Sequence, residues 1–129
     1  MRLWLSVLGL PLSVLGYLLP LLVHAEEPRV QLLVQSSPLA GYRYGEGAEV
    51  WPLLREGDAL ELVPEPGNAH DANAVRVEWR GHKLGYVPRR ENAALAWGLD
   101  RGTAIRARIS KLAEHANPAR RIEFEVYIE

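Results

Sequence analysis

Several residue types in this chain of 129 amino acids could do chemistry, but their spacing argues against the common catalytic sites. His70, His82 and His115 show no His-Glu-x-x-His spacing, and the chain contains no cysteine, which argues against zinc binding and thiol chemistry. No serine lies in a nucleophile-elbow sequence, and no glycine-rich phosphate loop precedes the expected helix. We therefore expect a protein that is not an enzyme and that uses neither a metal ion nor a cofactor.

The densest group of polar side chains lies in residues 57–90. Pro66-Gly67-Asn68 is typical of a turn, and the side chains of Asp71 and Asn73 can hydrogen bond to loop amides, so a structural turn is one interpretation. Residues 76–90 carry five basic residues against one acidic residue. This excess could follow a phosphate backbone, or it could form a solvated surface with partners in the same chain. The five basic residues are Arg76, Arg80, Lys83, Arg89 and Arg90.

These polar residues must be positioned mainly by β structure, because apolar and polar residues alternate along most of residues 29–128. Ser36-Ser37-Pro38 is expected to end the first strand. Helical spacing predicts one helix over Arg90–Leu99 with Gly102 as its stop, and a short helical turn over Glu49–Leu54. The expected strands cover residues 29–35, 60–62, 75–79, 83–87, 105–109 and 122–128.

Five or six short strands with one or two short helices predict a mostly β fold, a small closed or nearly closed β-barrel. Thr103–Lys111 and Arg121–Ile128 should form an antiparallel hairpin in which the numbers of opposed residues sum to 231, an odd number. That register places Arg108 opposite Glu123 and Arg106 opposite Glu125, with the apolar residues of both strands on one face. Three tryptophans are expected in the core: Trp51, Trp79 and Trp97.

Length, composition and charge restrict the function further. A chain of 129 residues is too short for a (β/α)₈ barrel or a two-lobed kinase. The hydrophobic content of 48% and the four tryptophans argue against extensive disorder. A net charge of −1 argues against strong nonspecific binding of nucleic acid.

Three sequence blocks within residues 57–90 carry a family resemblance. They are Gly-Asp-Ala-Leu-Glu-Leu from Gly57, Glu-Pro-Gly-Asn-Ala-His-Asp-Ala-Asn-Ala-Val-Arg-Val from Glu65, and Leu-Gly-Tyr-Val-Pro-Arg from Leu84. In this order they resemble the HIRAN domain, which occurs in eukaryotic fork-remodelling helicases and as stand-alone bacterial proteins. The resemblance covers residues 29–129 and implies a small OB- or SH3-like barrel.

The resemblance also implies a function, namely binding of single-stranded DNA with its terminal 3′-hydroxyl in a pocket. Tyr42-Arg43-Tyr44 would stack on bases, and Asp71 would accept a hydrogen bond from the hydroxyl while repelling an internal phosphate. His70 stands where the family commonly has a tyrosine, and an imidazole can still stack. The candidate nucleic-acid-binding residues are Tyr42, Arg43, Tyr44, His70, Asp71, Asn73, Lys83, Arg89 and Arg90.

Residues 1–25 are expected to lie outside this domain, which would comprise residues 26–129. Residues 3–23 carry no charge, follow Arg2 and lead to Ala25 before two glutamates, a pattern typical of a secretory signal cleaved after Ala25. The uncharged run is also long enough for a membrane anchor. In both cases we expect the domain outside the cytoplasm, periplasmic or secreted. There the alternative function is an interaction module for an envelope protein, peptide or glycan.

Overall fold

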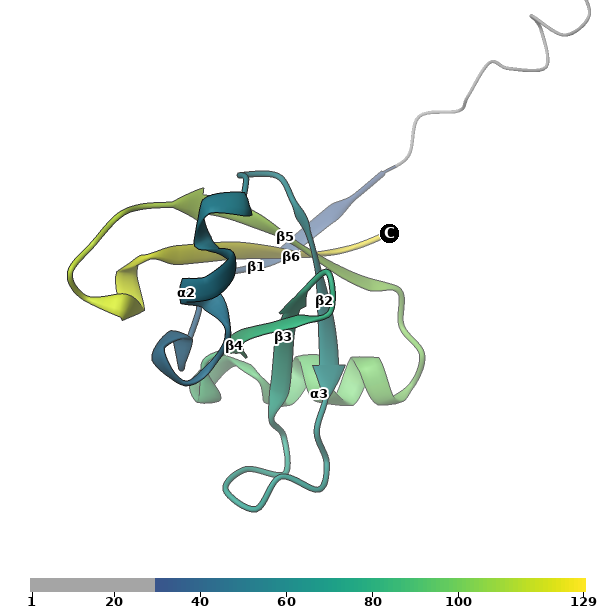
Figure 1. The fold of residues 1–129 in the computed structure, drawn as a ribbon. Helices are drawn as coiled ribbons and strands as arrows, with labels where there is room; N and C mark the ends of the chain where they lie inside the picture. The colour runs from purple at the N-terminus through teal and green to yellow at the C-terminus, as the bar shows by residue number, and fades with distance from the viewer. Residues whose placement is uncertain (1–29) are drawn as a thin grey trace, which may run out of the picture.

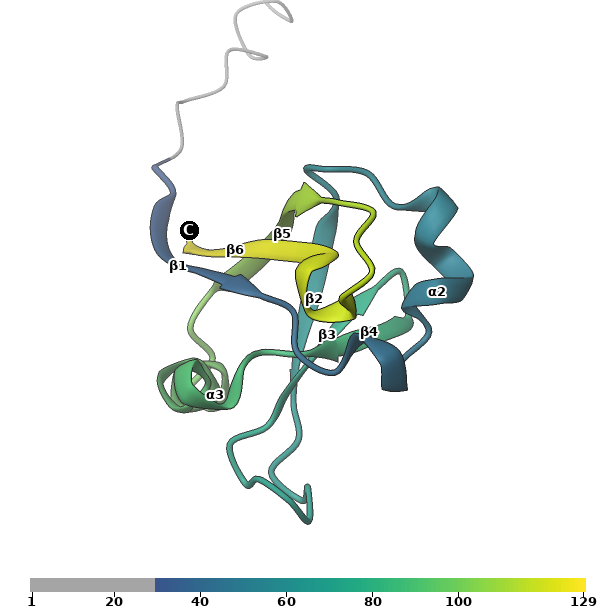
Figure 2. The same cartoon turned by 90° about the vertical axis from the view of Figure 1, so that its left-hand side faces the viewer.

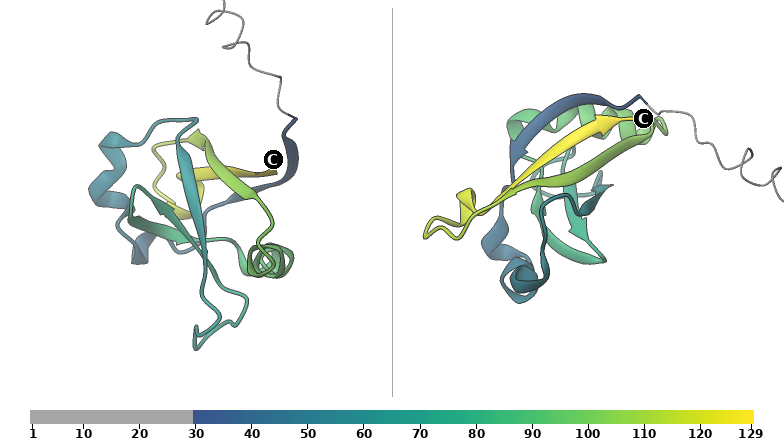
Figure 3. Two further views of the ribbon diagram at one scale, coloured as in Figure 1. Left: turned by 90° about the vertical axis from the view of Figure 1, so that its right-hand side faces the viewer. Right: turned by 90° about the horizontal axis from the view of Figure 1, so that it is seen from above.

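The computed structural model describes residues 30–129, which form six antiparallel strands in the order β1-β6-β5-β2-β3-β4. Figures 1 and 3 show the sheet curling, so that β1, β6 and β5 lie across the other three strands. The strands are Leu32–Pro38 (β1), Ala59–Pro64 (β2), Val75–Trp79 (β3), His82–Tyr86 (β4), Ile105–Leu112 (β5) and Ile122–Ile128 (β6).

The leader expected at residues 1–25 lies outside the described residues. Across residues 30–129, none of the helices combines the length and the apolar character needed to cross a membrane.

The two edge strands of the sheet meet at one point. Ala40, two residues after β1, forms an isolated bridge with Tyr86 at the end of β4, through hydrogen bonds of 2.9 and 2.8 Å. Gly85 permits this approach, because a Cβ atom there would lie 2.2 Å from the carbonyl oxygen of Ala40. The fold is therefore the expected mostly β, OB-like type, with a sheet that is not closed and one bridge across its gap.

Short helical segments fill the connections, and Figure 2 shows α2 (Gly47–Val50) and α3 (Ala93–Asp100) on opposite sides of the domain. The expected helix over residues 90–99 begins later, because Arg89–Glu91 forms a 3₁₀ turn (η3) before α3. Gly102 ends it with φ +79°, and its N–H donates to the Leu99 carbonyl. The remaining segments are Tyr42–Tyr44 (η1), Trp51–Leu53 (η2) and Pro118–Arg120 (η4).

The core follows the alternation seen in the sequence. Each predicted apolar face on β3, β5 and β6 points inward, and the buried residues include Val75, Val77, Trp79, Ala107, Ile109, Ile122, Phe124 and Val126. Trp97 is the exception, since its side chain is 62% exposed and the Arg101 guanidinium lies 3.8 Å from its ring centroid. Trp51 is half-buried. The prediction of a core position was therefore wrong for Trp97.

The β5–β6 hairpin has the predicted orientation and faces, but the predicted register is wrong. Ala107 lies opposite Val126, so Arg108 is paired with Glu125 rather than Glu123, and its Nε lies 3.1 Å from the carboxylate. Arg106 lies opposite Tyr127. The connection is centred further along the chain than predicted, because η4 forms there, and a bulge between Ile109 and Lys111 shifts the pairing again.

Strand β1 also departs from the prediction. Ser36-Ser37-Pro38 continues the strand instead of ending it, and Ser37 is buried. Leu32, Leu33 and Val34 are exposed, because β1 is an edge strand with a bulge between Leu33 and Gln35. The apolar residues at its start therefore do not contribute to the core.

The close contact at Gly85 leaves no room for a side chain at this position. We expect Gly85→Ala to lower the free energy of unfolding by about 1–3 kcal/mol, because the added methyl group collides with the backbone of Ala40. Gly67→Ala is the matched control, since nothing lies within 4 Å of a Cβ there. Urea denaturation followed by tryptophan fluorescence measures both variants, and equal transition midpoints would contradict the role given to Gly85.

Candidate functional site

A pocket of about 310 Å³ opens between the β2–β3 loop and the segment that links β4 to α3. Figures 1 and 2 show this loop projecting from the body of the domain. Three residues predicted from the sequence, His70, Asp71 and Arg89, meet here, and we call the site the Asp71 pocket. It is lined by Ala40, Asn68, His70, Asp71, Ala74, Tyr86, Val87, Arg89 and Asn92.

The Asp71 carboxylate has several partners in the pocket, and 20% of its side chain is exposed. Its Oδ1 accepts a hydrogen bond of 2.9 Å from the backbone amide of Asn73, and its Oδ2 accepts one of 2.7 Å from Asn92 Nδ2. Arg89 Nε lies 3.7 Å from Oδ2. The two hydrogen bonds, with the Arg89 charge, lower the pKa of Asp71 despite partial burial. Asp71 is thus an ionised acceptor at neutral pH, with lone pairs left for a ligand.

Asn92, at the start of α3, holds Asp71 in place. Asn92 was not among the site residues predicted from the sequence. It occupies the N-cap position, where an asparagine side chain usually caps the first helical turn. Here the side chain makes no cap hydrogen bond, is almost fully buried, and donates to Asp71 instead. The predicted helix began at Arg90 and so placed Asn92 inside it, and no sequence signal points from Asn92 to a residue 21 positions earlier.

The β2–β3 loop holds its shape through its own side chains, as the turn interpretation predicted. Asn68 Oδ1 accepts hydrogen bonds from the amides of His70 at 2.8 Å and Asp71 at 3.2 Å. Asn73 takes part through its backbone amide, and its side chain is exposed. The turn residues therefore position the carboxylate, so the structural interpretation and a binding site are compatible.

Glu65 anchors this loop to the sheet. Its carboxylate accepts hydrogen bonds from Asn68 Nδ2 at 3.0 Å and from the Tyr86 hydroxyl at 2.9 Å, and it forms an ion pair with Arg76. Burial opposes ionisation of Glu65, but the hydrogen bonds from these three partners outweigh it and lower the pKa. The Tyr86 ring lines the Asp71 pocket, with Lys83 Nζ 4.6 Å from its centroid.

A second pocket of about 300 Å³ adjoins the first, because Ala40 lines one and Gly41 lines the other. We call it the Tyr44 pocket. Tyr44 is 80% exposed, and Arg43 beside it is exposed as well. The pocket is lined by Gly41, Tyr42, Arg43, Tyr44, Asn117, Pro118 and Ala119.

Four of the predicted site residues do not lie as expected. Tyr42 is 5% exposed, and its ring meets Trp51 edge to face at 6.4 Å, so it belongs to the core and offers no free face for stacking. Three others line neither pocket, namely Asn73, Lys83 and Arg90. The sequence missed Tyr86 and Asn92, which line the Asp71 pocket.

The hydrogen bonds to Glu65 and Asp71 predict acid sensitivity. The ordinary pKa values are 4.5 for Glu65 and 3.8 for Asp71, and both are lowered in the folded protein. The unfolded chain therefore binds more protons at acid pH. The stability that these carboxylates confer is complete above their ordinary values and is lost as the pH falls through the folded-state pKa values. Denaturant titrations across this pH range should show the decline.

Glu65→Gln should make this decline shallower, because the carboxyl that titrates is gone. Glu61→Gln is the matched control, since Glu61 is exposed on the adjoining strand and should keep the wild-type slope. Parallel pH profiles for Glu65→Gln and the wild type would contradict the assignment.

Comparison with known proteins places this geometry in a family. The model of the HIRAN domain family matches residues 32–129. A solved protein from Lactobacillus plantarum is similar, with a TM-score of 0.66 and 27% identity over 77% of this chain and 95% of that one. The HIRAN domain of human HLTF is similar in fold, with a TM-score of 0.59 and 22% identity over 76% of this chain and 78% of that one.

A curated relative shares a shorter stretch. Over 73 residues the chain is 36% identical to the Fanconi-associated nuclease 1 homolog of Oryza sativa subsp. japonica. The match covers 54% of this chain and 7% of that protein, so this chain corresponds to a small part of it. The family match, in contrast, includes all six strands and the residues of both pockets. The chain therefore belongs to the HIRAN domain family.

Proposed function

We propose that this HIRAN domain is a non-catalytic module that binds the 3′ end of single-stranded DNA in the Asp71 pocket. The observation that carries the proposal is an ionised, part-exposed carboxylate held at the pocket wall by Asn73 and Asn92. A carboxylate accepts a hydrogen bond from a terminal hydroxyl and repels a phosphate at the same place. Such a group selects a free end over the interior of a strand.

The neighbouring residues supply the other contacts that a strand end needs. Arg89 is 74% exposed at its side chain, which leaves its guanidinium available to a phosphate, although it also donates to the His70 carbonyl at 2.6 Å. The His70 and Tyr86 rings line the same pocket and can pack on the terminal sugar or base. From there the strand would pass Ala40 and reach the exposed Tyr44.

A second candidate is an interaction module outside the cytoplasm, and the exposed apolar start of β1 favours it. Leu32, Leu33 and Val34 are 61%, 56% and 44% exposed, and an edge strand can accept a strand from a partner. This candidate requires export by the leader expected at residues 1–25. Intact-mass measurement should then find a chain that begins at Glu26. A membrane fraction that retains Met1 would support the anchor and contradict cleavage.

The end-binding proposal predicts a preference that fluorescence anisotropy can measure. The domain should bind a single strand with a free 3′-hydroxyl more tightly than the same strand carrying a 3′-phosphate. Asp71→Ala should remove this preference and spare much of the salt-dependent affinity, because the phosphate contacts remain. Equal binding of the two strands by the wild-type domain would contradict the proposal.

Two adjacent arginines provide a matched pair for the phosphate contact. Arg89 lines the pocket, whereas Arg90 lies outside it, and each substitution by alanine removes one positive charge. Arg89→Ala should weaken binding at low salt and lower the salt slope by about one, and Arg90→Ala should have the smaller effect. The reverse order would show that the strand follows another path.

A further inference from the structure

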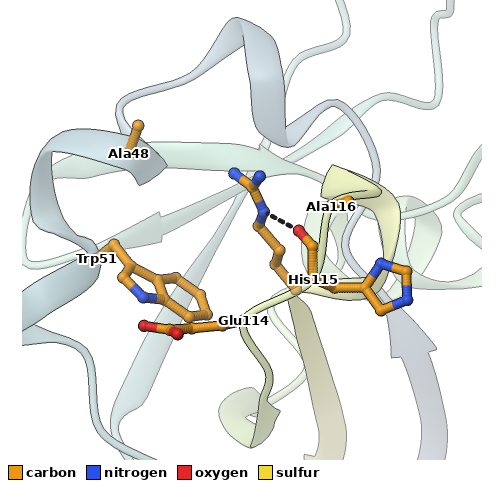
Figure 4. A pocket seen from close by; sticks show the side chains of 6 residues that line it. Ala48, Trp51, Glu114, His115 and Ala116 are labelled. Carbon is orange, nitrogen blue, oxygen red and sulfur yellow. Dashed lines mark hydrogen bonds between the residues drawn. The ribbon is translucent and has the colours of Figure 1, made fainter.

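A third pocket, of about 450 Å³, lies between the α2–η2 segment and the β5–β6 loop. Figure 4 shows Trp51 on one side of this pocket and His115 and Ala116 on the other. We call it the Trp51 pocket, and it contains none of the residues predicted from the sequence as DNA-binding. It is lined by Ala48, Trp51, Glu114, His115, Ala116 and Arg121.

The Trp51 pocket continues the line of the other two. The same β5–β6 loop lines it with residues 114–116 and lines the Tyr44 pocket with residues 117–119. Figure 2 shows this loop, η4 and the segment after β1 on one face of the domain. Neighbouring chain segments therefore line the three pockets in turn, from the Asp71 pocket through the Tyr44 pocket to the Trp51 pocket. OB folds cover about 4 to 16 nucleotides of a single strand, and we expect one strand of this length to contact all three pockets.

The Trp51 pocket combines an aromatic side chain with a cation that has no acidic partner. Arg121 Nε donates to the His115 carbonyl at 2.8 Å, which fixes the side chain, and the guanidinium lies 5.2 Å from the centroid of the Tyr42 ring. Within residues 30–129 no carboxylate forms an ion pair with Arg121. Its terminal N–H groups are therefore available to a phosphate or to the edge of a base.

Glu114 is the acidic group of this pocket. Its side chain is exposed, lines the pocket and forms no ion pair within the described part of the chain. A carboxylate repels phosphate but accepts a hydrogen bond from an exocyclic amino group, as carboxylates do from cytosine N4. Thymine has no such group. The combination of Trp51, Glu114 and Arg121 thus favours a stacked, amino-bearing base over thymine.

We propose that the Trp51 pocket is a second nucleobase subsite, which prefers cytosine to thymine at a fixed distance from the 3′ end. This inference rests on the proposed end binding, because that end sets the register of the strand. It adds base selectivity to a site that otherwise recognises a sugar and phosphates. Trp51 stacks on the base, Glu114 accepts from its amino group, and Arg121 pairs with the backbone beside it.

The test uses oligothymidine of about 12 nucleotides, within the range that OB folds cover, with one cytosine moved stepwise along it. Anisotropy titrations should show about three- to tenfold tighter binding when the cytosine reaches one internal position. Glu114→Ala should abolish this preference without weakening binding to plain oligothymidine, because a charge that repels phosphate is removed. Glu123→Ala removes an exposed carboxylate that does not line the pocket, and should keep the preference.

A second variant tests stacking. Trp51→Leu keeps an apolar side chain and should weaken binding of the longer strand about fivefold or more, while a strand of about 4 nucleotides binds as before. Thermal unfolding by circular dichroism verifies that the variant is folded.

The results of these titrations distinguish a failure of the Trp51 subsite from a failure of the proposed end binding. A 3′-hydroxyl preference without any cytosine effect, or a cytosine effect that survives Glu114→Ala, would overturn the Trp51 subsite. Equal affinity for free and 3′-phosphorylated strands would overturn end binding. A cytosine preference that is then the same at every position, and is still lost in Glu114→Ala, would support the base subsite alone.

Discussion

Two backbone hydrogen bonds join Ala40 to Tyr86 where the edges of the open sheet approach each other. They require Gly85, because any side chain there would meet the Ala40 carbonyl. The bridge brings the chain after β1 beside the end of β4. Ala40 and Tyr86 then become two walls of the Asp71 pocket, and the following residues line the Tyr44 pocket. The contact between Ala40 and Tyr86 thus places the Asp71 pocket beside the Tyr44 pocket.

The position of the Asp71 carboxylate depends on this frame. Its three partners come from the loop itself, from η3 and from the residue before α3, so its position depends on segments far apart in sequence. Glu65 ties the same loop to Tyr86 and Arg76 in the sheet. A charged acceptor held in this way needs little reorganisation when a hydroxyl arrives, and such preorganisation favours binding.

Features that depend on local sequence pattern, such as the strands, could be predicted from the sequence. Features that depend on contacts between distant segments could not. Alternation located β3 and β6 because each has one buried face, as Val75 and Val77 show. It could not reveal the bulge after Ile109 or the exposed position of Trp97. Tyr42 and Tyr44 are equivalent in sequence, yet the η1 turn buries one ring and exposes the other.

The same limit applies to the candidate site. The motif blocks identified His70, Asp71 and Arg89, because these residues lie within or beside short patterns that the family shares. Asn92 remained unnoticed, since its role arises only when α3 packs beside the β2–β3 loop.

The central claim is that a 3′-hydroxyl binds at Asp71, and a ¹H–¹⁵N NMR titration tests it most directly. Asn73 and Asn92 donate their N–H groups to this carboxylate, so their signals report its surroundings. The account predicts that the Asn92 side-chain amide and the Asn73 backbone amide shift with a strand that has a free 3′-hydroxyl. They should shift far less with the same strand ending in a 3′-phosphate. Shifts confined to β1, with both reporter signals unchanged, would contradict the account.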